Sequence, residues 1–442
     1  MKLILLFLIL STTAQAGEFS VTLKTAEDAA LAASGQYRAA LAAAEAAQSA
    51  AAAAAAPLGP RVALEGSLRY NEVVTEMKLG ALTRPLGDNW NYSLGPSAYY
   101  TLYDGGALRG AYEAGRRNAL ARKAEAEQAR RQALLKARTA YFNMQLALEK
   151  VYLIGENLQL ALSQLKDMEL GVKAGTRSRL DGIRARQEAT ARRRDLLRAR
   201  RDLAAALREL TYAAGLEFKG DISLPLDARM AGRDYGGAAA GVYIKADSYG
   251  DILARLLPAA EKPADPALPA AAALENSAEA YRYSAKAYGA ERLPRLNLGA
   301  RSSLDYPNGP NLYSFLQNSA SLSLSLPLFE SGRSGEKRKE SELNAKTALE
   351  RRADILRAAR RDFDAARDAY AALLAEQALN IEAADDADDA ARLAYDAYQA
   401  GGGTWLEVES ANLKVLQART TAAMTNSEIL VRLAQLDSLS AN

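Results

Sequence analysis

The sequence contains no cysteine and no histidine among its 442 residues. These absences exclude zinc sites built on either residue, thiol nucleophiles, disulfides and Ser-His-Asp triads. Aromatic residues make up only 7% of the chain, whereas alanine is abundant, and this composition suits long helices at close spacing. The formal net charge of +3 argues neither for nor against nucleic acid as a partner.

Long hydrophobic runs are also missing, because no segment has the ~20 consecutive apolar residues that a membrane-spanning helix needs. The N-terminus carries Lys2, a short apolar stretch from Leu3 to Leu10, and the small-x-small sequence Ala14-Gln15-Ala16, which is the pattern of a secretory signal. We therefore predict a signal peptide at residues 1–16. The mature protein is expected to be exported and to enter a membrane only through strands.

The remaining chain reads as two copies of one plan. Segments 94–106 and 320–332 carry similar strand-to-turn sequences, and their offset is 320 − 94 = 226. The pair Ala174-Gly175 matches Ala400-Gly401 at the same offset, since 400 − 174 = 226. Two landmarks that share one register without a gap indicate a duplication.

The duplication sets the predicted domain boundaries. The first structural repeat spans residues 17–218 and the second spans residues 271–442. Between them, residues 219–270 contain five prolines, which exclude a long helix, so we predict a Pro-rich irregular connection. Each repeat is expected to run helix, strand, loop, strand, long helix, tight turn, helix.

Alternation of apolar and polar residues predicts two strands in each repeat. Leu322, Leu324 and Leu326 alternate with serines, and the segments around residues 62–70, 90–103 and 296–301 alternate similarly. Strands of about ten residues with one apolar face and one small-polar face are typical of transmembrane barrels. A half-buried sheet in a soluble sandwich is the alternative, but the predicted export and the aromatic residues at strand ends favour the barrel.

Two proline-free segments, from about Leu108 to Lys173 and from Gly335 to Gln399, predict helices of ~65 residues, or about 100 Å each. Such lengths require coiled-coil-like packing. The first segment supplies an apolar seam with 3-4 spacing that includes Ala137, Tyr141 and Met144. The helix after residue 405 has two apolar stripes and should therefore have a neighbour on each side.

These features together resemble the TolC-like outer-membrane efflux protein family, also called outer membrane factors. The resemblance rests on the strand–turn–helix junctions Tyr103-Asp104-Gly105-Gly106 and Phe329-Glu330-Ser331-Gly332. It rests also on two helix-to-helix segments, residues 172–181 and 398–411, whose turns are here called the first tip and the second tip. It covers the mature chain except for the Pro-rich middle.

The resemblance implies an α + β membrane protein of the outer membrane. It implies a homotrimer whose transmembrane β-barrel takes four strands from each protomer and continues as a long periplasmic α-helical barrel. It also implies an exit duct for efflux or type I secretion, with a periplasmic adaptor and an inner-membrane pump as partners. No cofactor, no metal and no enzymatic activity are expected. The alternative is a secreted coiled-coil structural or interaction protein, which would leave the strands unexplained.

Site residues follow from the same resemblance and from charge. The tips imply an adaptor-docking surface at Gly175, Thr176, Arg177, Gly401, Gly402, Gly403 and Thr404. Asp181 and Glu407 match the family's gate carboxylates, whereas Ser410 and Gly403 replace a second carboxylate and a latch arginine. The acidic run that contains Asp385, Asp386 and Asp389 is a further candidate for the lumen. Ion pairing between helices is the alternative, because Arg192, Arg193 and Arg194 lie at a similar height on a potential neighbour.

Overall fold

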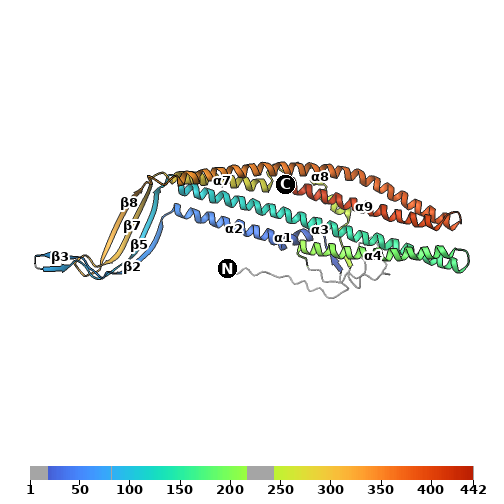
Figure 1. Ribbon diagram of the computed structural model, residues 1–442, viewed down its shortest axis with the longest axis horizontal. Coiled ribbons are helices and arrows are strands. Elements are labelled where there is room, and N and C mark those ends of the chain that lie inside the picture. The colour runs from blue at the N-terminus through green and yellow to red at the C-terminus, as the bar shows by residue number, and fades with distance from the viewer. Residues whose placement is uncertain (1–17, 81, 217–242, 442) are drawn as a thin grey trace. The chain divides into compact units, whose positions relative to one another are not determined.

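The computed structural model describes residues 18–80, 82–216 and 243–441 (Figure 1). The predicted signal peptide therefore lies outside the described residues, as does the first half of the Pro-rich connection. The chain divides into two compact units. Unit 1 comprises residues 1–39, 128–268 and 356–442, and unit 2 comprises residues 40–127 and 269–355.

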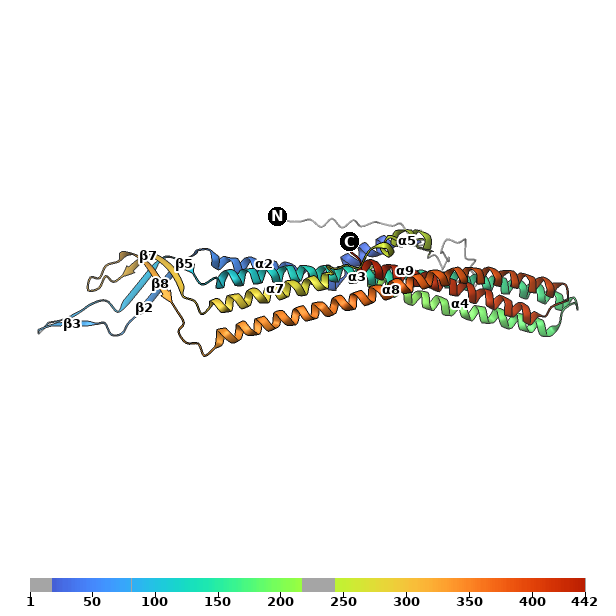
Figure 2. The same cartoon turned by 90° about the horizontal axis from the view of Figure 1, so that it is seen from above.

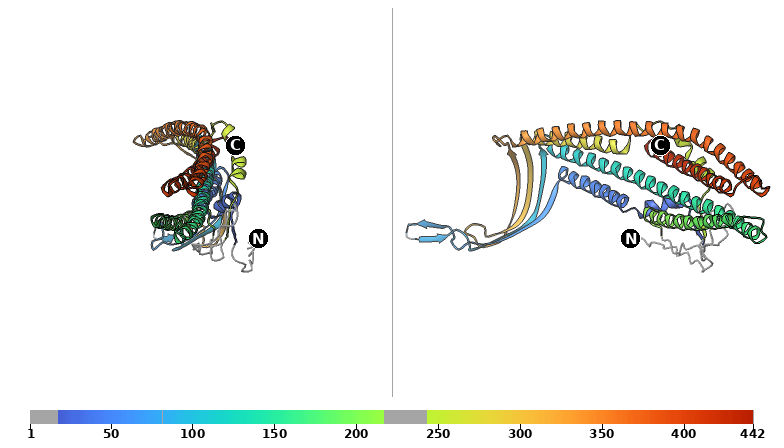
Figure 3. Two further views of the ribbon diagram at one scale, coloured as in Figure 1. Left: turned by 90° about the vertical axis from the view of Figure 1, so that its right-hand side faces the viewer. Right: turned by 45° about the vertical axis from the view of Figure 1, so that its right-hand side comes forward.

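Unit 2 contains one four-stranded antiparallel sheet with the order β2-β5-β7-β8. Its strands are β2 (Arg61–Tyr70), β5 (Trp90–Tyr103), β7 (Arg295–Tyr306) and β8 (Phe315–Ser325), which curve side by side in Figure 3. The sheet joins strands from both predicted repeats. Four helical segments complete the unit: α7 (Pro269–Ala290), most of α2 (Gly35–Ala55), and the N-terminal parts of α3 (Ala107–Lys173) and α8 (Arg333–Gln399).

The alternation of residues gives this sheet an apolar face that the chain itself does not cover. Val62 is 72% exposed, Leu64 74% and Leu324 71%. On the opposite face, short polar side chains bond between strands, as in the hydrogen bond from Ser93 Oγ to Asp305 Oδ1 (2.5 Å) and from Thr101 Oγ1 to Asn297 Oδ1 (3.0 Å). The predicted strands and their two faces are confirmed.

The segment between β2 and β5 is more regular than the loop that the sequence predicted. It contains a short hairpin of β3 (Glu76–Leu79) and β4 (Leu82–Pro85). Gly80 adopts a left-handed φ of 66° at its turn. Strands of four residues are too short for alternation to identify them.

Unit 1 is built on four helices that pack side by side in the order α4, α3, α9, α8. These are α4 (Arg179–Ala214), the later part of α3 (Ala107–Lys173), α9 (Trp405–Leu439) and the later part of α8 (Arg333–Gln399). Contacts fix the order: Arg186 of α4 pairs with Glu169 of α3, Asn412 of α9 bonds Gln164 of α3, and Arg419 of α9 pairs with Asp388 of α8. Among the described residues no helix is both long and apolar enough to cross a membrane.

The two repeats keep their register at the ends of the long helices. Helix α3 begins at Ala107 and ends at Lys173, and α8 begins at Arg333 and ends at Gln399. Both offsets equal the predicted one, because 333 − 107 = 226 and 399 − 173 = 226. The predicted seam of α3 is the core of unit 1, where Ala137, Tyr141 and Met144 are fully buried.

Smaller elements cover the four helices of unit 1: α1 (Leu23–Ala33), α5 (Tyr249–Leu256), α6 (Pro258–Glu261) and the parallel pair β1 (Glu18–Ser20) and β6 (Tyr243–Lys245). Figure 2 shows α5 on one side of the α3 and α9 helices. The described part of the Pro-rich connection is thus more ordered than expected. Ser248 accepts a hydrogen bond from the Asp251 amide and begins α5, and Pro258 begins α6.

A charged cluster in unit 1 joins four of its helices, α1, α3, α5 and α9. Arg138 of α3 donates from Nε to Glu27 Oε1 of α1 (2.6 Å) and from Nη1 to Asp437 Oδ2 of α9 (2.6 Å). Arg255 of α5 also pairs with Glu27, and Lys262 Nζ lies 3.8 Å from Asp437 Oδ1. Burial opposes the charge of Arg138, but the bonds and charges of Asp437 and Glu27 outweigh it, so the pKa of the guanidinium lies above its usual value.

Candidate functional site

The two tips lie at the same end of unit 1 and are built by turn glycines. Gly175 has φ 75° and Gly401 has φ 81°, a backbone region that side chains rarely adopt. The helices that follow are capped by Ser178, which accepts from the Leu180 amide, and by Thr404, which forms a capping box with Glu407. The predicted tight turns are confirmed, while their role in adaptor docking stays a prediction.

A single arginine joins the tips. Arg177 of the first tip donates from Nη1 to the Tyr398 carbonyl (3.0 Å) and from Nη2 to the Gln399 carbonyl (3.3 Å). Its guanidinium also lies 4.4 Å from the centre of the Tyr398 ring. Gly403, where the family resemblance places a latch arginine, has no side chain that could make such contacts. We call the three contacts of Arg177 the tip clasp.

An aromatic cluster beneath the clasp was not anticipated from the sequence. Trp405 is buried, and its ring meets Tyr398 edge-on at 5.4 Å. The Tyr398 hydroxyl donates to Met168 Sδ (3.3 Å), and Ala185 and Val408 complete the core of the cluster. The signal that could have revealed it is Trp405 itself, one of only two tryptophans, placed directly after a glycine-rich turn.

The two predicted gate carboxylates occupy different settings. The Glu407 carboxylate accepts a hydrogen bond from the Thr404 amide (2.8 Å), so it caps α9. Asp181 lies in the first turn of α4, where a negatively charged carboxylate interacts favourably with the helix dipole. Burial and the negative charge of Asp181 raise the pKa of Tyr398, against the opposing charge of Arg177. Asp181 therefore acts electrostatically on the residue that the clasp holds.

The structure separates the acidic run of α8 into members with different surroundings. Asp388 pairs with Arg419 (2.7 Å), and Asp389 pairs with Arg392 one turn along the same helix (2.9 Å). Asp386 is exposed and has no ion-pair partner among the described residues. Asp385 lines a pocket of about 520 Å³ between α3, α8 and α9. The four acids therefore do not form one shared site.

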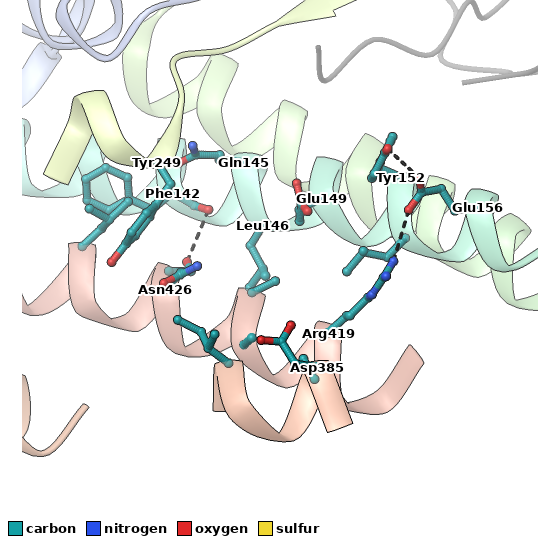
Figure 4. Close-up of a pocket in the computed structure, with 17 residues that line it drawn as sticks. Phe142, Gln145, Leu146, Glu149, Tyr152, Glu156, Tyr249, Asp385, Arg419 and Asn426 are labelled. Atoms are coloured by element: carbon teal, nitrogen blue, oxygen red, sulfur yellow. Dashed lines mark hydrogen bonds and ion pairs between the residues drawn. The ribbon is translucent and has the colours of Figure 1, made fainter. Parts of the chain in front are cut away.

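Figure 4 shows that pocket, in which Arg419 reaches from α9 toward Glu156 of α3, while Asp385 enters from α8. Arg419 Nη1 lies 3.6 Å from Glu156 Oε2, and Tyr152 donates its hydroxyl to Glu156 (2.6 Å). Arg419 thus links α3, α8 and α9 through Glu156 and Asp388. Phe142, Leu146 and Ile381 add apolar walls.

Near the tips, α4 also buries a carboxylate. Glu188 is 4% exposed, and neither of its oxygens has a hydrogen-bond partner among the described residues. Burial raises its pKa, the charge of Arg192 opposes this, and the charge of Glu409 raises it further. The ionised form is therefore penalised in the folded state.

We expect Glu188→Gln to raise the melting temperature at neutral pH. Because the folded-state pKa of Glu188 lies above the unfolded one, the penalty is complete above the folded pKa and disappears below the unfolded pKa. The gain should consequently shrink as the pH falls through that window. Melting curves at several pH values, with the exposed Glu209→Gln as control, measure it. A gain that is independent of pH would contradict a charge effect.

A four-stranded sheet with an uncovered apolar face, two equal long helices and paired helical tips define the class of outer-membrane channels. A family model for the outer membrane efflux protein matches residues 27–216 and 262–442. The chain therefore belongs to the outer membrane efflux protein family, and it is an outer-membrane exit duct for efflux, as the sequence predicted. The two matched segments also agree with the predicted two-fold repeat. No curated protein sequence matches the chain.

Solved structures show the same fold. The chain is similar to CusC, whose crystal structures concern conformational changes in folding and channel formation, with a TM-score of 0.74, 20% identity, and coverage of 98% of this chain and 96% of that one. It is similar to the outer membrane protein VceC from Vibrio cholerae (TM-score 0.73, 20% identity, 94% and 95% covered). It is also similar to the open state of the Neisseria gonorrhoeae MtrE outer membrane channel (TM-score 0.70, 19% identity, 94% and 88% covered).

Proposed function

We propose that three copies of this chain close one barrel and one helical tunnel, and that the tips dock a periplasmic adaptor that is joined to an inner-membrane pump. The observation that carries the proposal is the sheet of unit 2. Strand β2 pairs only with β5 and β8 only with β7 in the described chain, so both edges are open beside an exposed apolar face. Lipid does not tolerate unpaired strand edges, and further copies of the chain would pair them.

The number of copies, three, follows from the family resemblance. The role of a conduit, rather than of an enzyme, follows from the chemistry of the chain. Four strands from each of three protomers would give a barrel within the usual range for outer-membrane proteins. The carboxylates discussed above are helix caps, ion pairs or isolated acids, an arrangement that fits a conduit rather than a catalyst. A secreted coiled-coil protein would not need the sheet.

We assign the tip clasp to the closed gate of this duct. Arg177 takes the place of the latch arginine that the family resemblance would put at Gly403. It connects the two hairpins of one chain, and opening would separate them. Asp181 and Glu407 are proposed as the acids nearest the gate. Of the acidic run, Asp385 is proposed to meet permeating cations, since it faces a pocket rather than a neighbouring arginine on its own helix.

Adaptor docking is tested by adding bulk to a tip without straining its backbone. Gly402 lacks a left-handed φ, and a Cβ there would meet only the Ala397 carbonyl oxygen at 3.8 Å. We expect Gly402→Trp to keep the oligomer and the pore but to lose most export in cells, because the indole would obstruct the adaptor. Gly35→Trp, at an equally open position far from the tips in sequence, is the control. Unchanged export in Gly402→Trp would argue against docking at the tips.

A further inference from the structure

Two exposed stripes on unit 1 have opposite charge and coiled-coil spacing. The α4 stripe recurs every three or four residues and consists of Ile183, Gln187, Thr190, Arg194, Leu197, Arg201, Ala205, Arg208 and Tyr212. The α8 stripe has the same spacing and consists of Asp368, Ala372, Ala375, Leu379, Glu382, Asp386, Asp389, Leu393 and Asp396. All of these residues are exposed.

Both stripes include large apolar side chains that are exposed at the spacing of a helix-packing seam. Leu197 and Ile183 of the α4 stripe are 53% and 45% exposed, and Leu379 and Leu393 of the α8 stripe are 65% and 63% exposed. Leucines at seam positions are buried when a second helix packs on them. Each stripe thus carries apolar side chains that nothing in the described part of the chain covers.

The charges of the two stripes are complementary. The α4 stripe carries three arginines and no acid, and the α8 stripe carries five acids and no base. The ion pairs of the arginines within the chain are weak ones: Arg194 lies 3.9 Å from its sequence neighbour Asp195, and Arg201 pairs with Asp202. Such exposed local pairs leave the guanidinium groups available to other carboxylates.

The stripes cannot pair within one chain, because α3 and α9 lie between α4 and α8 (Figure 1). A second copy can bring its α8 stripe to the α4 stripe of the first. Each copy carries one stripe of each kind, so the contact is heterologous and repeats around a ring.

The register of the two stripes supports this pairing. The tip clasp joins Arg177, just before the start of α4, to Gln399 at the end of α8, so antiparallel residues at one height have numbers that add to about 177 + 399 = 576. In the stripes, 197 + 379, 183 + 393, 194 + 382 and 208 + 368 all equal 576.

We infer that the α8 stripe of one protomer packs against the α4 stripe of the next, with Leu197 on Leu379, Ile183 on Leu393, Arg194 on Glu382 and Arg208 on Asp368. The inference rests on the proposed assembly of several copies and names the surface that forms it. It places Asp386 and Asp389 between protomers, close to Arg186, Arg193 and Arg194 of the neighbour, rather than in the lumen. Asp385 lies off the stripe.

The natural absence of cysteine makes a direct test possible in the full-length protein. Leu197→Cys/Leu379→Cys, oxidised in native membranes, should give covalent dimers and trimers on a non-reducing denaturing gel. The control is Leu197→Cys/Leu374→Cys, since Leu374 is exposed on α8 but off the stripe. We expect at least about tenfold more covalent oligomer from the stripe pair, because a disulfide needs closely approaching Cα atoms.

A charge swap tests the register independently. Arg194→Glu should reduce the heat resistance of the oligomer on a gel, and adding Glu382→Arg should restore it. Adding Asp396→Arg instead should not restore it. The sum 194 + 396 = 590 exceeds 576 by 14 residues, which places that arginine about 20 Å along the helix from residue 194 of the neighbour.

The outcomes separate this inference from the proposed function. Covalent oligomers from the stripe pair alone, with rescue by Glu382→Arg alone, support the seam. Equal cross-linking of the control, cross-links confined to single chains, or no cross-link in a protein that light scattering shows to be oligomeric would overturn the seam and leave the duct intact. A protein that is monomeric in light scattering would overturn both.

Discussion

Replacing Arg138 with alanine is expected to lower the free energy of unfolding of unit 1 by about 3–5 kcal/mol. The side chains of Arg138 and Glu27 are only 12% and 8% exposed. Removing the guanidinium leaves Glu27 with Arg255 alone and Asp437 with the distant Lys262, so buried negative charge loses its principal partner. The effect should be greatest in α1, which Arg138 connects to α3 and α9.

Hydrogen exchange of the α1 amides measures this loss locally, without requiring the whole oligomer to unfold reversibly. Arg361→Ala is the matched control, because Arg361 is 76% exposed and, among the residues that the structure describes, pairs only with its neighbour Asp362. We expect the control to change stability by only ~0–1 kcal/mol. Adding Glu27→Gln to Arg138→Ala should recover part of the loss, and no recovery would show that packing rather than charge is responsible.

Removing the tip clasp is the second large effect that we expect. Arg177→Ala eliminates two hydrogen bonds from a charged donor and one cation–π contact, together about 2 kcal/mol in a partly exposed setting. At tenfold for each 1.4 kcal/mol, the ratio of open to closed channels should rise about 30-fold. Single-channel recordings in planar bilayers would show this as longer or more frequent openings.

Arg179→Ala is the control for the clasp, since Arg179 carries the same charge two residues later and makes no contact with the second tip among the described residues. Arg177→Lys should fall between the variants, because an ammonium keeps the charge but not the planar fork that reaches two carbonyls. Equal conductance in wild type and Arg177→Ala would mean that the clasp does not hold the gate.

Sequence periodicity was sufficient for the two long helices, for the four strands of the unit 2 sheet and for the repeat. Serine and leucine alternate at 321–326, and apolar residues recur with 3-4 spacing through Tyr141. Each pattern shows which side of one strand or helix is apolar from residues that are close in sequence. The short β3–β4 hairpin was not predicted, because its four-residue strands are too short to show an alternation of apolar and polar residues. Helix α5 was not predicted, because its residues lie in the Pro-rich connection. Prolines exclude a long helix there, but they are compatible with short helices between them.

The site was less accessible from sequence, for a physical reason. Arg177 was predicted only as part of the adaptor-docking surface, and its partners are backbone carbonyls more than 220 residues away, which no side-chain pattern encodes. Glu407 was interpreted as a gate acid, yet its carboxylate also caps its own helix. The acidic run was one feature in the sequence, but rotation by 100° per residue turns Asp385, Asp386 and Asp388 toward different surroundings.

The mass of the detergent-solubilised protein, measured by light scattering with the detergent contribution subtracted, tests the central claim most directly. If four strands per chain close a barrel only with those of other copies, the particle should contain three chains. A stable particle of one chain with its full β-sheet content in circular dichroism would contradict the account, because a single sheet with two open edges would then persist without a partner.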